Sequence, residues 1–329
     1  MRLLLCISAA ALPACDLCTL STAVEARDGR TGLSLGILQD YGHAGRLVEA
    51  GNLRRNSEDQ HINTSSTKLV ASYRFTESVG LRLNLPYVVK SWQRREPSGL
   101  DRGSDSGLGD TLVELTGTPV RLMASWGTLV VACFAGVEMP TGNSSRLQEE
   151  STVAPPAPRP IPYPGATIGI RHVPVAGGGT ANVIHGHQLT LGSGSWDVVA
   201  GVQMRVSTDR FYFTLYSYGH LNGSGTHDYR FGPMVAWGAG PGAYLVFDDQ
   251  GTLGLTANCS GQASRRDTVH GEKLAHSGGT YVYVGPSLTG TWSNRLSGEL
   301  GLDLPVVQKT NGTQIVDTWR MHGGLTWRL

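Results

Sequence analysis

The chain has 329 residues, of which only 16% are charged and 40% hydrophobic, and its formal net charge is +1. A nearly neutral chain lacks the strong positive field that nucleic acid requires, so we expect no nucleic acid as a partner. Glycine accounts for 44 residues, well above its usual share. Abundant glycine together with threonine, valine and tyrosine favours strands and turns over helices. After the first 20 residues no run of 18 apolar residues occurs, so the sequence predicts no transmembrane helix.

The first residues have the pattern of a secretory signal peptide. Arg2 supplies the positive start, residues 3–12 are apolar, and Pro13-Ala14 ends the apolar run. Such a run is too short to span a membrane and is removed during export. We therefore predict a signal peptide over residues 1–14.

A C-x-x-C pair, Cys15 and Cys18, directly follows this segment. The sequence ending at Cys15 resembles a lipobox, which would make Cys15 the lipidated first residue of a lipoprotein, whereas ordinary cleavage would leave a plain thiol. The pair could instead form a disulfide, which persists outside the cytoplasm, or hold a metal. It is not a haem attachment site, because Thr19 stands where that motif has histidine. These alternatives stay open, and residues 15–29 are predicted to be a periplasmic segment.

Alternation of apolar and polar residues with a period of two dominates the rest of the chain and predicts β-strands. In one such run, Leu81 and Leu83 share one face while Arg82 and Asn84 share the other. Several runs have 12 or more residues, whereas strands of soluble domains usually have about 5–6 residues. Twelve runs can be counted, at 30–43, 64–76, 79–93, 107–118, 124–139, 194–206, 208–221, 229–246, 252–265, 279–292, 295–307 and 314–329.

The connections between these runs alternate in length. Short links such as Glu77-Ser78 and Thr208-Asp209 alternate with connections that are usually longer, and the longest covers 140–193. Short periplasmic turns and long external loops are typical of a bacterial outer-membrane barrel with an even number of strands. A closed barrel also pairs every backbone polar group inside the bilayer. We therefore predict an all-β chain: a transmembrane antiparallel β-barrel of about 12 strands over residues 30–329, surrounded by outer-membrane lipid.

The end of the chain resembles the C-terminal signal that the barrel-insertion machinery reads. His322, Gly324, Trp327 and Leu329 carry this resemblance, although the signal usually ends in phenylalanine rather than leucine. We expect the insertion machinery to be a partner through the last strand.

Five short sequence words occur in a fixed order along the chain. Together they resemble the transporter-like outer-membrane β-barrel family named for the meta-pathway of phenol degradation. The resemblance covers residues 65–329 and implies an outer-membrane barrel with a channel or transport role, without catalytic residues. The words are FTESVGLRLNLPYV at Phe75–Val88, SGLGD at Ser106–Asp110, MPTG at Met139–Gly142, LGSGSWD at Leu191–Asp197 and DYRFG at Asp228–Gly232.

Charged residues on the polar strand faces are predicted to line the lumen, while Leu83, Val202, Leu302 and Trp327 face lipid. Buried charges need partners, so the lumen holds either a mutually neutralising network or a polar permeation path. Their signs are mixed, so no preference for anions or cations follows. Twelve strands lie between filled 8-stranded barrels and open porins, which predicts a narrow or plugged pore. The candidates are Lys68, Arg74, Arg82, Lys90, Asp110, Glu114, Glu138, Asp197, Arg205, Arg230, Glu299, Asp303, Arg320 and Arg328.

The long connection at 140–193 is predicted to be mostly external. Its proline cluster at 155–164 and glycine run at 177–179 disfavour helix and central strand. Residues 143–185 are therefore expected to be mobile and dispensable for barrel assembly. His185 and His187 lie in this connection and have the chemistry to chelate a transition metal; solvated loop histidines are the simpler interpretation.

The sequence offers no signature of an enzyme. It contains no H-x-S or H-E-x-x-H pattern, so we predict neither catalysis nor a cofactor. The leading prediction is an outer-membrane channel for small solutes, with hydrophobic or aromatic ones favoured by the family resemblance. The alternative is a plugged structural or metal-binding barrel without conductance.

Overall fold

The computed structural model describes residues 31–96, 98–151, 183–293 and 295–329. These residues are nearly all in strands, which confirms the predicted all-β class. A search of the described residues found no helix with the length and apolar character needed to cross a membrane. The predicted signal peptide and the C-x-x-C segment lie outside the described residues.

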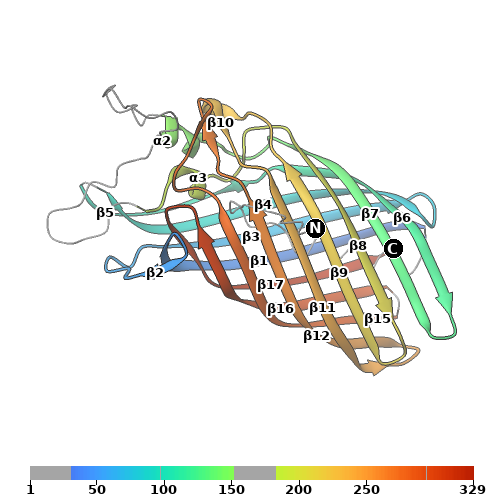
Figure 1. Cartoon of the computed structure of the whole chain (residues 1–329). Helices are drawn as coiled ribbons and strands as arrows, with labels where there is room; N and C mark the ends of the chain where they lie inside the picture. The colour runs from blue at the N-terminus through green and yellow to red at the C-terminus, as the bar shows by residue number, and fades with distance from the viewer. Residues whose placement is uncertain (1–30, 97, 152–182, 294) are drawn as a thin grey trace, which may run out of the picture.

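Twelve strands of the described chain form a closed antiparallel barrel (Figure 1). Each strand is hydrogen-bonded to the strands before and after it, and the last pairs with the first, with Ser34 opposite Arg328. The strands are β1 (Gly32–Glu49), β3 (His61–Arg74), β4 (Val79–Glu96), β6 (Thr111–Ala124), β7 (Gly127–Met139), β8 (Asp197–Ser207), β9 (Phe211–Leu221), β11 (Met234–Phe247), β12 (Gly251–Ser264), β15 (Gly279–Trp292), β16 (Leu296–Thr310) and β17 (Thr313–Arg328). Every one of the predicted runs therefore corresponds to a barrel strand.

The two faces of the wall follow the alternation of the sequence. Leu83, Val202 and Trp327 are 42%, 48% and 51% exposed on the outside of the barrel, whereas the neighbouring Arg82 is 1% exposed. An apolar outer surface is what a barrel wall needs against lipid hydrocarbon. The long strands with an apolar outer face, the closed ladder of backbone hydrogen bonds and the short turns at one end place this chain in the bacterial outer membrane.

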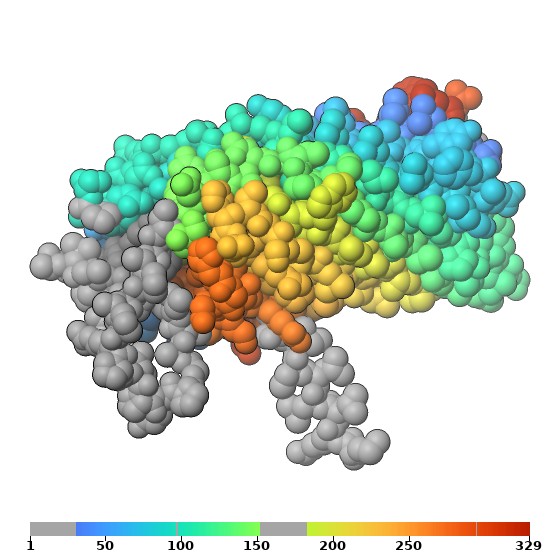
Figure 2. Space-filling view, turned by 90° about the horizontal axis from the view of Figure 1, so that it is seen from above, coloured from blue at the N-terminus to red at the C-terminus, as the bar shows by residue number. Residues whose placement is uncertain are grey.

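Several short strands extend beyond the barrel at the end that carries the long connections, called here the outer end. β2 (Asn52–Arg54) pairs with β1, and β5 (Gly99–Leu108) pairs with the outer half of β4. A small separate sheet contains β10 (Tyr229–Arg230), β13 (Thr268–Val269) and β14 (Glu272–Lys273). In Figure 2 the segments of this small sheet gather at one end beside the green segment near residue 150.

One predicted lumen residue is placed differently by the structure. Arg230 lies on β10 outside the barrel wall, and its side chain is exposed and donates to the carbonyl of Asn222. The predicted run 229–246 is interrupted because Pro233 has no N–H to donate and the N–H of Gly232 donates instead to Asp267 at 2.8 Å. The barrel strand therefore begins only at Met234.

The described ends of the long connection pack into the barrel mouth. They contain the short helices η1 (Ser145–Leu147), α2 (Gln148–Ser151) and α3 (Gly186–Leu189); a further turn, η2 (Thr226–Asp228), lies in the next long connection. Residues 143–151 and 183–191 are called the plug below. The expectation of a mobile external loop over 143–185 is therefore wrong for the described ends, because their apolar residues are buried; residues 152–182 lie outside the described part.

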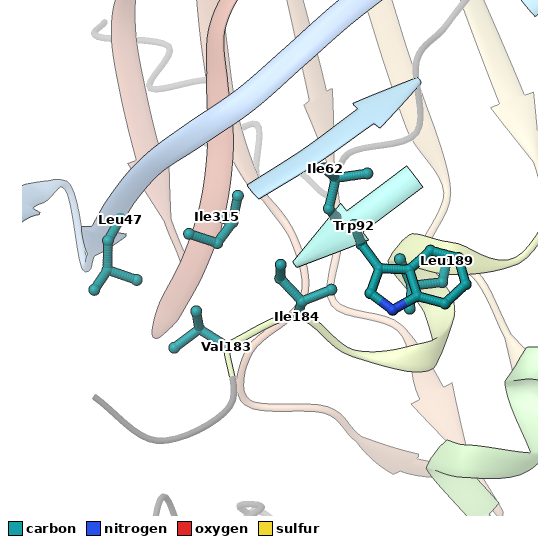
Figure 3. Packing of buried hydrophobic residues seen from close by; sticks show 7 residues of the cluster. All are labelled: Leu47, Ile62, Trp92, Val183, Ile184, Leu189 and Ile315. Carbon is teal, nitrogen blue, oxygen red and sulfur yellow. The ribbon is translucent and has the colours of Figure 1, made fainter. Parts of the chain in front are cut away.

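Figure 3 shows the apolar contacts that seat the plug. Val183, Ile184 and Leu189 from the plug are at most 2% exposed. They pack against residues of the strands β1, β3, β4 and β17, namely Leu47, Ile62, Trp92 and Ile315. Burying such side chains contributes about 1.5–3 kcal/mol each, so the plug is firmly seated in the described structure.

Candidate permeation path and its outer plug

Asp110 connects the barrel wall to both ends of the plug segment. Its carboxylate accepts hydrogen bonds from the N–H of Gly142 at 2.8 Å and from the N–H of Ser193 at 2.5 Å. The Thr141 hydroxyl donates to the carbonyl of Gly109 at 2.8 Å. Three of the sequence words, SGLGD, MPTG and LGSGSWD, therefore meet at this junction. Asp110 was predicted as a lumen charge, and the structure shows both of its oxygens holding backbone instead.

Substituting Gly192 with alanine should destabilise this junction. A β-carbon on Gly192 would lie 2.6 Å from the Asp110 carboxylate and 2.7 Å from the α-carbon of Gly142. Overpacking of this kind costs about 1–3 kcal/mol. We expect a lower unfolding midpoint in a urea titration in detergent, whereas Gly219→Ala, whose new β-carbon finds its nearest neighbour at 3.8 Å, should change little. Equal midpoints for the two variants would contradict this.

Lys90 is the wall residue that holds the plug most directly. It is 5% exposed, and its ammonium donates to the carbonyl oxygens of Gln188 at 2.8 Å and Thr190 at 2.7 Å. A hydrogen bond from a charged donor is worth about twice a neutral one. Lys90, predicted as a lumen charge, therefore binds the plug backbone and holds the plug in the barrel mouth.

A second set of polar contacts joins the plug to the β4–β5 hairpin. Arg94 donates to Asp101 at 2.9 Å and to Glu149 at 2.8 Å. Arg146 donates to Asp105 at 3.0 Å and lies 4.7 Å from the centroid of the Trp92 ring. The Arg94 side chain is 8% exposed in its pairs, whereas Arg146 and Asp105 are 30% and 34% exposed, so water screens the Arg146 pair more than the pairs of Arg94.

The buried pair of His187 and Glu150 fixes the two plug ends to each other. Nδ1 of His187 lies 2.9 Å from the Glu150 carboxylate, which also accepts the His187 N–H at 3.0 Å. Burial opposes charge on both groups, but the pair's mutual attraction lowers the pKa of Glu150 to about 2 and raises the pKa of His187. Asp267 and Lys90 also act on His187, with opposite signs.

The plug should be most tightly docked in mildly acidic solution. The raised pKa of His187 stabilises docking fully below about 6.5, and this contribution is lost as pH rises through the folded pKa. The lowered pKa of Glu150 stabilises docking above about 4.5, and this contribution is lost as pH falls toward 2. Amide hydrogen exchange of residues 186–190, corrected for its intrinsic pH dependence, should show maximal protection between these limits. His187→Gln should abolish the loss on the alkaline side, and an unchanged profile would contradict the assignment.

The two histidines predicted as metal ligands are buried rather than solvated. The ring of His185 stacks on His187 with centroids 5.7 Å apart and on His276 at 5.9 Å. Among the described residues neither belongs to a group of three convergent ligating side chains. Cys15 and Cys18 lie outside the described residues, so the rest of that metal prediction, like the lipidation of Cys15, stays a prediction.

Charged side chains inside the wall pair with one another. Near the short turns, Arg82 and Glu114 form a buried pair at 3.7 Å, and Asn84 donates to Glu114 at 3.0 Å. Lys68 pairs with Asp40 at 2.5 Å. Each of these two cations therefore has an acidic partner in the wall.

A second part of the network combines charges with tyrosine rings. Arg205 lies 4.2 Å from the ring centroid of Tyr212, and Arg320 lies 3.6 Å from that of Tyr283. His322 lies between two acids, with Nε2 3.4 Å from Glu299 and Nδ1 3.4 Å from Asp303, which is 3.7 Å from Arg320. The remaining candidates lie at the strand ends. Arg74 donates to the carbonyl of Glu77 at 3.0 Å and Arg328 is half-buried at the end of β17, while Glu138 and Asp197 lie at the outer ends of β7 and β8.

Buried aromatic residues of the interior were not singled out from the sequence. Tyr212, Tyr216 and Tyr218 on β9 are at most 8% exposed, as are Tyr281 and Tyr283 on β15. They stand at even spacings along their strands, opposite the exposed Phe211 and Phe213 on β9, and this alternation is the signal that identifies them. The interior therefore contains aromatic rings as well as charged groups.

The spaces found inside the described barrel are small. One cavity of about 30 Å³ is lined by Arg205, Tyr212 and His322 among others, and another of about 60 Å³ lies below the plug beside His187 and Gln314. A single water needs about 10–15 Å³ by this measure. Each of these two spaces holds a few waters at most.

Comparison with known proteins supports the fold. No family model and no curated protein matches the chain. An outer membrane channel from Pseudomonas putida F1 superposes with a TM-score of 0.55 at 12% sequence identity, over 91% of this chain and 96% of that one. The fold is that of an outer-membrane β-barrel.

Two further solved structures are less similar. The β-domain of the Bordetella autotransporter Brka has a TM-score of 0.46 at 8% identity, covering 91% of this chain and all of that one. The monoaromatic hydrocarbon channel CymD has a TM-score of 0.38 at 10% identity, covering 98% and 95%. These likenesses carry no argument about function, and the specific family named from the sequence words stays a prediction.

Proposed function

We propose that this barrel is a gated channel for small solutes of hydrophobic or aromatic character, and that the plug is its gate. The observation that carries the proposal is the seating of the plug. Its carbonyl oxygens accept from Lys90 and its apolar residues fill the mouth, but no strand ladder joins it to the wall. Such a segment can leave the mouth while the barrel stays closed.

The aromatic interior supports the choice of solute. Buried tyrosines on β9 and β15 offer ring faces and hydroxyl groups along the path. Aromatic rings pair favourably in offset or edge-to-face geometry, by about 0.5–1.5 kcal/mol beyond burial. Arg205 and Arg320 already lie on the faces of Tyr212 and Tyr283. A flat aromatic solute would compete with these guanidinium groups for the same ring faces.

A catalytic role has no support in this arrangement, and we propose that the chain is not an enzyme. Ser195 donates its hydroxyl to Asp197 at 2.6 Å rather than to a histidine. A serine nucleophile needs a base that takes its proton. We further propose that lipid surrounds the outer wall and that the insertion machinery reads β17.

Planar-bilayer recording of the full chain tests the proposal. The intact protein should give rare, brief openings, and benzoate should shorten them more than acetate, which has the same charge and no ring. A correctly folded protein, verified by a heat-dependent gel shift, that never conducts would favour the alternative of a plugged structural barrel.

A further inference from the structure

Three side chains from adjacent strands converge on one point of the inner wall. Glu138 is the residue before the last of β7, Asp197 begins β8 directly opposite it, and His220 lies near the end of β9. His220 pairs with Val199, two residues after Asp197, so all three side chains share the inner face. Their ligating atoms lie within 4.8 Å of one another.

A single ring nitrogen meets both acids. Nε2 of His220 lies 3.0 Å from the Glu138 carboxylate and 3.7 Å from that of Asp197. Transition-metal bonds to nitrogen and oxygen of about 2.0–2.2 Å place neighbouring ligand atoms about 3–3.5 Å apart. One N–H donates well to one acceptor, so two acids this close to one nitrogen fit a shared metal ion better than two hydrogen bonds. The 3.0 Å separation matches that of neighbouring metal ligands, and the 3.7 Å separation is slightly longer.

His322, on β17, provides a contrast within the same molecule. Its two acids occupy different ring nitrogens, Glu299 at Nε2 and Asp303 at Nδ1. A protonated imidazole can donate to both, and no single ion can bridge all three groups through one nitrogen. The chain therefore shows what an ion-pair arrangement of one histidine and two acids looks like, and the His220 cluster differs from it.

Asp197 is held with one oxygen left available. It is 1% exposed, and its Oδ1 accepts from the Ser195 hydroxyl at 2.6 Å and from the N–H of Gly223 at 2.8 Å. No described group donates a hydrogen bond to the buried Oδ2, which faces His220. Orienting one carboxylate oxygen through hydrogen bonds while the other binds is the usual outer-shell support of a metal ligand.

We propose that Glu138, Asp197 and His220 bind a divalent transition-metal ion, with zinc as the probe of choice. Two carboxylates and a neutral imidazole balance the charge of the ion and suit zinc, copper or nickel. Three protein ligands leave a position for water. The ion would tie the end of β7 and the start of β8, which flank the plug segment, to β9. The proposal does not depend on conduction.

Equilibrium dialysis of the metal-stripped, detergent-folded full chain against zinc tests the site. Wild type should retain one zinc ion per chain, and His220→Gln and Glu138→Gln should each lose it. His322→Gln and His187→Gln are the matched controls and should retain it. Ser195→Ala should keep the stoichiometry but weaken binding roughly 10–100-fold, because Ser195 positions Asp197.

Two further readouts keep the test decisive. The heat-dependent gel shift shows that each variant is folded. Saturating zinc should raise the temperature of that shift by roughly 5 °C in wild type and in the controls that keep the site, and not in His220→Gln or Glu138→Gln. Cobalt should give visible absorption bands that His220→Gln removes. Equal zinc retention in wild type and His220→Gln would overturn the proposal, and so would loss of zinc in His187→Gln instead. His220 would then be only the charged partner of two acids.

Discussion

Replacing Glu114 with alanine should lower the free energy of unfolding by about 3–5 kcal/mol, because it breaks a buried ion pair by removing the carboxylate that faces Arg82. Arg82 and Glu114 are each 1% exposed and lie 3.7 Å apart near the short turns. A urea titration in detergent, followed by the heat-dependent gel shift, measures the loss.

Two controls separate this effect from simple loss of contact. The double variant Arg82→Met with Glu114→Met should recover most of the stability, since well-packed apolar residues replace buried ion pairs at little penalty. Glu49→Ala breaks the pair with Arg54, whose side chains are 46% and 57% exposed, and should change stability by about 1 kcal/mol or less. Equal losses for Glu114→Ala and Glu49→Ala would show that the Arg82 pair is solvated.

Replacing Lys90 with methionine should open the channel more often, by about tenfold or more. Each hydrogen bond from a charged group contributes about 1.5–3 kcal/mol, and Lys90 makes two of them to the plug backbone. Methionine keeps the length and apolar stem but cannot donate. Open probability in planar bilayers is the measurement.

Lys68→Met is the matched variant for this test. Lys68 is also an inward-facing lysine, but its partner Asp40 belongs to the wall. It should leave open probability near the wild-type value. If the two variants behave alike, or if Lys90→Met lowers open probability, Lys90 does not hold the gate.

The barrel wall could be predicted from the sequence because its signal is local. In β4, alternate residues such as Leu81 and Leu83 face lipid and Arg82 faces inward, and this spacing is readable within a few residues. In the predicted run at 229–246, Pro233 is a local signal of the interruption, whereas the acceptor that takes the Gly232 N–H, Asp267, lies far along the chain and could not be anticipated in the same way.

The plug and the His220 cluster depend on contacts between distant segments. Val183 and Ile184 follow a glycine- and proline-rich stretch that resembles a solvated loop, and contacts with residues of other strands, such as Leu47 and Trp92, explain their burial. His220 meets Glu138 through the register of three strands, and no short motif encodes that register. Residues that carry charge were therefore predictable as a class, but their partners were not.

The most direct test of the gated channel is to remove the plug and record the current. Residues 144–190 would be replaced by a short glycine–serine linker, with Gly142 and Ser193 retained so that the junction at Asp110 survives. Shortening a connection changes closure entropy little, so the heat-dependent gel shift should persist. We predict long-lived openings and a several-fold larger mean current than in the intact chain. A folded variant with the same rare openings as wild type would contradict the account, because the plug would then not be what closes the barrel.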